Sequence, residues 1–292
     1  MSQFSPDGKL LASGSDDRAI ILWDVDQASP TFGQPIGAPL TGHSSFVQRL
    51  AFSSDGRMLA SGDHEGEIRL WDLSTAEQLA PPMLENSLSI TSITFSPDGK
   101  ILASAGTDRF IRLWDVDRES ATFGQQIGSS LETHTGVDSG LQFSPDGAKL
   151  IAGGEIGIIQ IWDVDRDSNT YSQRLGPPLS DHQSSITGLF HTPDGKYLVS
   201  SELLGTILIW ELETGRTIKI PVQHAGEISI QDSALSRKGD SIAVLLRTGS
   251  VFLIDLNLDS WQWLACQRAN RNLTPEEWGQ FFGDEPYRET CG

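Results

Sequence analysis

Cysteine and basic residues are scarce in this chain of 292 residues. Two cysteines, Cys266 and Cys291, are too few for a disulfide framework. Lys plus Arg number 21 against 39 Asp plus Glu, and a formal net charge of -18 repels nucleic-acid phosphates and anionic lipid. No apolar run approaches the roughly 20 residues of a membrane span, and the N-terminal MSQFSPDGK lacks the pattern of a secretory signal. We therefore expect a cytoplasmic protein that binds neither nucleic acid nor membrane.

Motifs for cofactor and metal chemistry are also missing. The sequence has no glycine-rich phosphate loop ending in Lys-Ser/Thr and no GxGxxG fingerprint. No His/Cys cluster has the spacing of a zinc site. The sequence thus predicts no cofactor, no metal site and no enzymatic activity.

Glycine and tryptophan are plentiful, at 29 and 8 residues, and they mark an internal repeat. FSPDG and its variants end at six glycines: Gly8, Gly56, Gly99, Gly147, Gly195 and Gly239. Fifteen residues after each glycine comes a second mark: Trp23, Trp71, Trp114, Trp162, Trp210 and Ile254. An acidic residue follows every one of these positions. The chain therefore contains six related units.

The sequence pattern of each unit predicts short strands. Alternating apolar segments such as ITSITF from Ile90 precede the Pro-Asp-Gly turn, and segments such as ILASAG from Ile101 and FIRLWDV from Phe110 follow it. The pattern predicts an all-β fold with about four strands per unit over residues 1–256. After Leu256 the period becomes helical, and Thr274 and Pro275 are typical of a helix start, so residues 257–292 are predicted to be a helical C-terminal tail.

The units resemble the WD-repeat family. Gly42-His43, the serine at the position of Ser13, the acid at the position of Asp17 and the Trp-Asp pair carry the resemblance, which covers residues 1–256. It implies a β-propeller that binds a protein or peptide partner and does not catalyse a reaction. Six repeats are visible, the first is truncated before its Gly-His, and most propellers of this family close with seven blades. We therefore expect a seven-bladed parent.

The recurring His, Ser and Asp invite comparison with a catalytic triad. An active site is needed only once, whereas this set recurs and decays along the chain, so we interpret it as the hydrogen-bonded set that ties each blade together in the family. The predicted members are Ser13, Asp17 and Trp23; His43, Ser61, Glu65 and Trp71; and Asn86, Ser104, Asp108 and Trp114. Units 4 to 6 have lost one or both polar residues, and we expect Ile156 and Leu204 to fill that space with apolar packing. Replacement of Trp71 should therefore destabilise the protein more than replacement of Trp210.

Two surfaces are candidates for partner binding. Similar inserts follow units 1, 3 and 4 and carry Phe32, Phe123 or Tyr171. Each aromatic either pins its own loop against its blade, the interpretation we favour, or forms one of three prongs on a binding face. The opposite face is the predicted partner-binding face, and its candidate residues are Asp16, Phe46, His64, Thr107, Glu155, Leu203 and Arg247.

The tail from Trp261 to Gly292 resembles the C-terminal end of large bacterial STAND-type signalling ATPases that carry WD repeats. The resemblance implies that the propeller is the sensor or interaction end of such a protein, with ATPase and effector modules upstream of residue 1. The alternative is a free-standing WD-repeat scaffold that assembles a cytoplasmic complex. We also expect the tail to pack on the last blade, because its many aromatics need cover.

Overall fold

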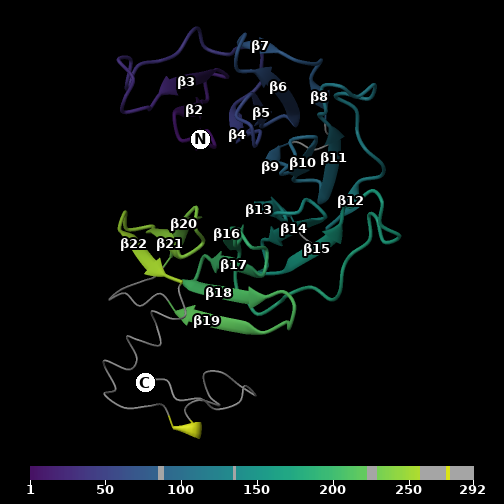
Figure 1. The fold of residues 1–292 in the computed structure, drawn as a ribbon, viewed down its shortest axis with the longest axis vertical. Coiled ribbons are helices and arrows are strands. Elements are labelled where there is room, and N and C mark those ends of the chain that lie inside the picture. Colours follow the sequence, from purple (N-terminus) through teal and green to yellow (C-terminus); the bar gives the residue numbers. More distant parts are fainter. Residues whose placement is uncertain (85–88, 134–135, 222–228, 257–273, 277–292) are drawn as a thin grey trace.

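The computed structural model describes residues 1–84, 89–133, 136–221, 229–256 and 274–276. These residues form six antiparallel sheets in chain order, joined by turns and loops (Figure 1). The predicted all-β repeat is thus confirmed over the described part of residues 1–256. No helix among the described residues is long and apolar enough to span a bilayer.

Each sheet contains an inner, a second and a third strand. The inner strands are β1 (Ser2–Phe4), β4 (Val47–Phe52), β9 (Ile90–Phe95), β13 (Val137–Phe143), β16 (Ile186–His191) and β20 (Ile230–Leu235). The second strands are β2 (Leu10–Gly14), β5 (Met58–Asp63), β10 (Ile101–Gly106), β14 (Lys149–Gly154), β17 (Tyr197–Glu202) and β21 (Ser241–Leu246). The third strands are β3 (Ile20–Asp24), β6 (Glu67–Asp72), β11 (Phe110–Asp115), β15 (Ile159–Asp163), β18 (Thr206–Glu211) and β22 (Val251–Asp255).

The outer position of the sheets is filled in two ways. Units 2, 3 and 5 have outer strands: β7 (Glu77–Gln78) and β8 (Met83–Leu84), β12 (Leu131–Glu132), and β19 (Thr217–Pro221). In units 1 and 4 the inserts instead make two single bridges each to the third strand, at Ile20–Leu40 and Trp23–Pro35 and at Ile159–Leu179 and Trp162–Arg174. The prediction of about four strands per unit therefore holds for units 2, 3 and 5, whereas the described sheets of units 1, 4 and 6 have three strands.

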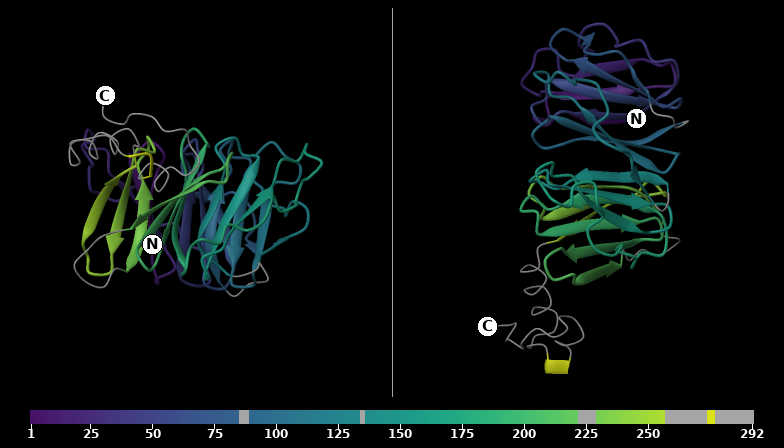
Figure 2. Two further views of the ribbon diagram at one scale, coloured as in Figure 1. Left: turned by 90° about the horizontal axis from the view of Figure 1, so that it is seen from below. Right: turned by 90° about the vertical axis from the view of Figure 1, so that its right-hand side faces the viewer.

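The repeated Ser-Pro-Asp-Gly segment forms the turn between inner and second strands. In unit 1 the Ser5 hydroxyl donates to Asp7 Oδ1 at 2.6 Å and accepts the backbone N–H of Leu10 at 2.9 Å. Gly8 has φ of 73°, a left-handed conformation in which glycine carries little steric penalty. The turns therefore all lie at one end of the sheets, which we call the Pro-Asp-Gly face. The turns between second and third strands lie at the other end, the opposite face (Figure 2).

The core lies between neighbouring sheets, with one apolar cluster for each successive pair. Between units 3 and 4, for example, Ala103 and Leu113 pack with Leu150 and Trp162, all 3% exposed or less. The inner strands contact one another in chain order, from β1 and β4 through to β16 and β20. The sheets therefore form an arc around a central axis, as in a β-propeller (Figure 1).

The arc is open between the first and last sheets in Figure 1. Across this opening, the Arg237 guanidinium donates to the Pro6 carbonyl at 2.6 Å. Alternate residues of β22 are uncovered, and Val251 and Leu253 are 62% and 79% exposed, whereas Ile207 to Trp210 in β18 are all buried. One face of the last sheet therefore has no cover among the described residues. The predicted helical tail and its contact with this sheet lie outside the described residues, apart from 274–276.

Candidate functional site

Four of the repeated tryptophans donate to the serine of their own unit. The Nε1–H groups of Trp23, Trp71, Trp114 and Trp210 lie 2.7, 2.8, 2.8 and 2.7 Å from the hydroxyls of Ser13, Ser61, Ser104 and Ser200. Each pair joins second and third strands as diagonal neighbours on one face of the sheet. The predicted Trp–Ser part of each set therefore lies together in these units.

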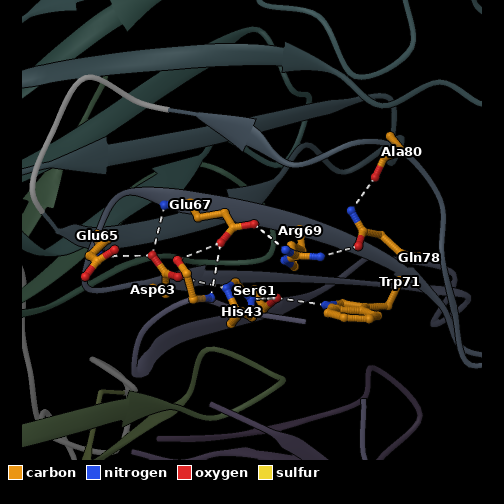
Figure 3. Close-up of polar contacts among 10 residues, drawn as sticks. His43, Ser61, Asp63, Glu65, Glu67, Arg69, Trp71, Gln78 and Ala80 are labelled. Carbon is orange, nitrogen blue, oxygen red and sulfur yellow. Dashed lines mark hydrogen bonds and ion pairs between the residues drawn. The ribbon is translucent and has the colours of Figure 1, made fainter. Parts of the chain in front are cut away.

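Unit 2 extends this pair into a buried relay (Figure 3). His43 Nε2 is 2.6 Å from Ser61 Oγ, and His43 Nδ1 is 3.1 Å from Asp63 Oδ2. Because a carboxylate only accepts, Nδ1–H donates to Asp63 and Nε2 accepts the serine hydroxyl. The order of donation is thus Trp71 to Ser61 to His43 to Asp63.

The prediction that Glu65 supplies the acid is wrong. Asp63 occupies that position, and Glu65 is an exposed turn residue whose backbone N–H donates to Asp63 Oδ1 at 3.0 Å. Side chains two residues apart on a strand point to the same face, so Ser61 and Asp63 both face His43, whereas the chain has already turned at Glu65.

Hydrogen bonds keep the buried Asp63 carboxylate ionised. Burial alone raises the pKa of Asp63, but the hydrogen bonds from His43 and from the backbone N–H of Glu67 lower it below its usual value. Glu67 in turn accepts the Ser44 hydroxyl at 3.1 Å and pairs with Arg69 at 2.5 Å. The relay therefore continues outward along the third strand (Figure 3).

Unit 5 repeats the Trp–Ser–His part of the relay, and an acid that the prediction had assigned as lost lies beside it. His182 Nε2 lies 2.6 Å from Ser200 Oγ, whereas His182 Nδ1 has no hydrogen-bond partner among the described residues and lies 3.5 Å from Glu202 Oε2. Glu202 also accepts the Ser184 N–H at 2.9 Å, so its longer side chain serves where unit 2 uses both Asp63 and Glu67. The stated reason for ranking Trp71 above Trp210 is thus wrong.

Ile156 and Leu204 do not fill space in the core as predicted. Both side chains point to solvent, with exposed fractions of 58% and 61%. They occupy the same turn position as Glu65, beyond the end of the second strand, where no packing space exists.

The remaining predicted members of these sets have separate partners. Asp17 Oδ1 accepts the Ala19 N–H at 3.0 Å, and Asp108 pairs with Arg112 at 2.6 Å. Asn86 lies outside the described residues. A sequence signal for the acids does exist, because His43 and His182 each have an acid twenty residues later, at Asp63 and Glu202.

The buried relay is unsuited to catalysis. Asp63, His43 and Ser61 have the order of a triad, but Ser61 is 0% exposed and its hydroxyl is held by Trp71, so a substrate has no access to it. His43, Asp63 and Glu67 also offer ligand atoms within 4.8 Å of one another. Since hydrogen bonds already engage these groups, the cluster is satisfied without an ion.

The three inserts are held to their own third strands by side-chain hydrogen bonds. The Asp after each tryptophan accepts hydroxyls from its own insert, as Asp115 does from Ser120 and Thr122 at 2.5 Å. Phe123 is partly buried against the cluster between units 2 and 3. Phe32 is 53% exposed, and it belongs to the unit with no preceding sheet. The favoured interpretation, that each aromatic pins its loop, therefore fits Phe123 and does not fit Phe32.

All seven candidate residues of the opposite face are exposed. Phe46, at 44% exposure, stacks on His64 with ring centroids 6.3 Å apart. In five of the six turns between second and third strands, one backbone N–H donates to a carbonyl of the loop before the inner strand. These bonds run from His64, Thr107, Glu155, Leu203 and Arg247 to Phe46, Ser89, Gly136, Ser185 and Ser229. A constant backbone thus presents chemically different side chains.

Comparison with known proteins accounts for the repeat. The pattern of the family "WD domain, G-beta repeat" (WD40) matches residues 1–24, 33–72, 83–115, 124–163 and 174–211. The chain belongs to the WD-repeat family. The matches cover units 1 to 5, in which a tryptophan is the penultimate residue of the third strand.

One similar protein is "Protein hir1" of the fission yeast Schizosaccharomyces pombe. It is 37% identical over 62 residues, which amount to 17% of this chain and 7% of that protein. The chain thus spans a small fraction of this relative's length. The similarity is that of a WD-repeat segment.

Proposed function

We propose that this WD-repeat protein is a non-catalytic interaction scaffold whose opposite face binds a protein or peptide partner. The observation that carries the proposal is the repeated backbone bond behind the face, which fixes the backbone while the side chains differ. A preorganised surface loses little conformational entropy on binding. Phe46, Leu203 and Leu204, at 44%, 40% and 61% exposure, supply apolar contact area on it.

The test is comparative capture of binding proteins from cells of the source organism. We expect Phe46→Glu/Leu203→Glu to lose at least one protein that the parent chain captures in stoichiometric amount. The matched control is Phe32→Glu/Ile36→Glu, which changes two similarly exposed apolar residues on the insert of unit 1. Identical sets of proteins captured by the face variant and the control would contradict the proposal.

The wider context we propose is the C-terminal end of a cytoplasmic bacterial signalling protein of the STAND ATPase type. Its support is the resemblance of residues 261–292 to the tails of such proteins. The alternative is a free-standing scaffold. An in-frame phosphate loop in the gene upstream of Met1 favours the first, and a promoter and ribosome-binding site directly before Met1 favour the second.

Residues 257–292 form, in this proposal, a separate tail that covers the open face of β22. The uncovered Val251 and Leu253 support it, as does the presence of Trp261, Trp263, Trp278, Phe281, Phe282 and Tyr287 in the tail. The competing occupants are a seventh blade from a longer chain and a second copy of this chain.

Deletion of residues 257–292 is expected to lower the melting temperature by several degrees and to promote self-association, because an apolar sheet face is uncovered. Leu253→Lys should then lower the melting temperature of the full chain and leave that of the truncated chain unchanged. Thermal unfolding and light scattering measure both effects. If the truncated chain stays monomeric and has the same melting temperature as the full chain, the tail does not cover this face.

A further inference from the structure

A pocket lies at the Pro-Asp-Gly end of unit 2, beside the short connection that this unit has in place of an insert. The pocket has a volume of about 490 Å³, and its lining includes Leu10, Arg57, Asp72, Leu73, Ser74 and Arg118. These residues come from units 1, 2 and 3. The lining therefore combines two guanidinium groups, one carboxylate and apolar surface. We call it the Arg57 pocket.

Units 1 and 3 show what occupies the equivalent place when an insert is present. In each, the lysine directly after the turn glycine pairs with an aspartate of the insert. Lys9 and Asp26 are 3.0 Å apart, and Lys100 and Asp117 are 2.8 Å apart. Each aspartate stands three residues after the tryptophan of its unit. The insert thus supplies a carboxylate to the basic residue of the turn.

Unit 2 has the basic residue of this pair without the acid. Arg57 directly follows Gly56, but Ser74 stands three residues after Trp71. Arg57 is exposed, and its guanidinium has no hydrogen bond or ion pair among the described residues. Its five N–H groups are therefore available to a ligand.

The backbone places Arg57 and Ser74 as it places the paired residues of the other units. The Leu73 N–H, next to Ser74, donates to the Arg57 carbonyl at 3.0 Å. The equivalent bonds of units 1 and 3 end at the carbonyls of Lys9 and Lys100, and both are 2.9 Å long. Arg57 and Ser74 thus occupy the positions that the lysine and the insert aspartate have in units 1 and 3.

The aspartate of the same turn does not take the place of the missing acid. Asp55 Oδ1 accepts the Ser53 hydroxyl at 2.6 Å and the backbone N–H of Arg57 at 3.0 Å. In unit 1 the equivalent Asp7 accepts the backbone N–H of Lys9 at 3.1 Å, and the Lys9 side chain nevertheless pairs with the insert. A basic side chain at this position therefore pairs with the acid of the connection and not with that of the turn.

The carboxylate in the lining is already neutralised. Arg118, from the insert of unit 3, pairs with Asp72. Hydrogen bonds from Ser74 and from Arg118 lower the pKa of Asp72 far below its usual value, so it is ionised at neutral pH and offsets the charge of Arg118. The lining therefore has one unpaired positive charge, that of Arg57, in a chain whose net charge is -18.

We propose that the Arg57 pocket binds a single carboxylate of a peptide or protein partner, which takes the place of the insert aspartate of units 1 and 3. The planar guanidinium of Arg57 donates two parallel hydrogen bonds to it, and Leu10 and Leu73 contact apolar atoms beside it. The negative charge of the whole chain disfavours an acidic run, so the ligand is one Asp or Glu among apolar residues. The pocket is at the other end of the sheets from the opposite face and does not depend on the function proposed for that face.

Titration of the full chain with an end-blocked Gly-Leu-Asp-Leu-Gly peptide tests the proposal. We expect the side-chain Nε–H NMR signal of Arg57 and the amide signal of Gly56, which also lines the pocket, to shift saturably. The same peptide with Asn in place of Asp should shift them at least tenfold less at equal concentration. Equal effects of the two peptides, or no shift from either at millimolar concentration, would overturn the proposal.

Removal of the guanidinium separates binding from folding. Arg57→Gln should weaken binding of the Asp peptide at least tenfold, as followed by the Gly56 amide signal. It should leave the melting temperature unchanged, because the guanidinium has no partner to lose. Lys196→Gln is the matched control, since it removes the same charge at the equivalent exposed position of unit 5 and should leave binding unchanged.

Ser74→Asp tests the site in a chain that keeps Arg57. This variant restores the acid of the repeat, and the new carboxylate should pair with Arg57 as Asp26 does with Lys9. Binding of the Asp peptide should therefore weaken at least tenfold. If either Ser74→Asp or Arg57→Gln binds the peptide as tightly as the parent chain does, the Arg57 pocket is not the site.

Discussion

Asp63→Ala is expected to lower the free energy of unfolding by about 3–5 kcal/mol, because it leaves several buried donors without an acceptor. Asp63 is 0% exposed and accepts from His43 Nδ1 and from the backbone N–H groups of Glu65 and Glu67. The alanine methyl cannot accept any of these hydrogen bonds, and water has no access to replace them. The loss is a large part of the roughly 5–15 kcal/mol that stabilises a typical domain.

Glu65→Ala is the matched control for Asp63→Ala. Glu65 lies two residues further along the chain and is exposed. We expect its replacement to leave the denaturant midpoint unchanged. Chemical denaturation followed by far-UV circular dichroism measures both variants, and equal slopes show that the same surface unfolds. If Glu65→Ala lowers the free energy of unfolding more than Asp63→Ala does, Glu65 is the acid of the relay, as the sequence alone suggested.

The repeat predicted the fold because its two marks correspond to separate structural requirements. The Pro-Asp-Gly glycines adopt the left-handed conformation of a tight turn, as Gly8 does with φ of 73°. The tryptophan fifteen residues later is the penultimate residue of the third strand and donates to the serine of the second strand, as Trp71 does to Ser61. Turn and strand lengths together set this spacing, so the sequence alone locates the strands of all six units.

The acid of the relay was misplaced because aligned positions do not reveal which side chains share a face. Glu65 corresponds to Asp17 and Asp108 by position, and all three lie in the turn after the second strand. When the six units are aligned, Asp63 and Glu202 stand at the same position as Ser15, Gly106, Gly154 and Leu246. An acid is therefore not a repeated feature of this position. The period-2 alternation of a strand identifies them once Ser61 and Ser200 are known to face inward.

A hollow of about 380 Å³ at the Pro-Asp-Gly face could not be predicted from any single unit. It is lined by residues of five units, which meet only when the sheets are arranged around the axis. The substitution of His191 for the repeated phenylalanine was visible in the sequence as HTPDG. Its burial, and the lack of partners for its ring, depend on the neighbouring unit that covers it.

Trp71→Ala and Trp210→Ala are expected to destabilise the protein equally, within about 1 kcal/mol. Both indoles are buried, at 3% and 4% exposure, and each donates to a serine that is itself bound to a histidine. Each variant should lose about 3–5 kcal/mol of aromatic packing and about 1–2 kcal/mol from the serine left without its donor. This expectation replaces the ranking based on Leu204, because Leu204 lies in the turn and the acid beside His182 is Glu202, 3.5 Å from Nδ1.

Trp162→Ala provides the comparison without a serine. Trp162 is 1% exposed, and Ala152 stands at the serine position of its unit. It should therefore show the packing loss alone. Trp71→Phe and Trp210→Phe keep most of the aromatic volume and remove the Nε1–H, so each should be milder than its alanine variant and fold well enough for a full denaturation curve. If Trp71→Phe lowers the free energy of unfolding much more than Trp210→Phe does, the expected equality is wrong and the relay of unit 5 is the weaker one. The physical cause would be the distance of 3.5 Å between His182 Nδ1 and Glu202 Oε2.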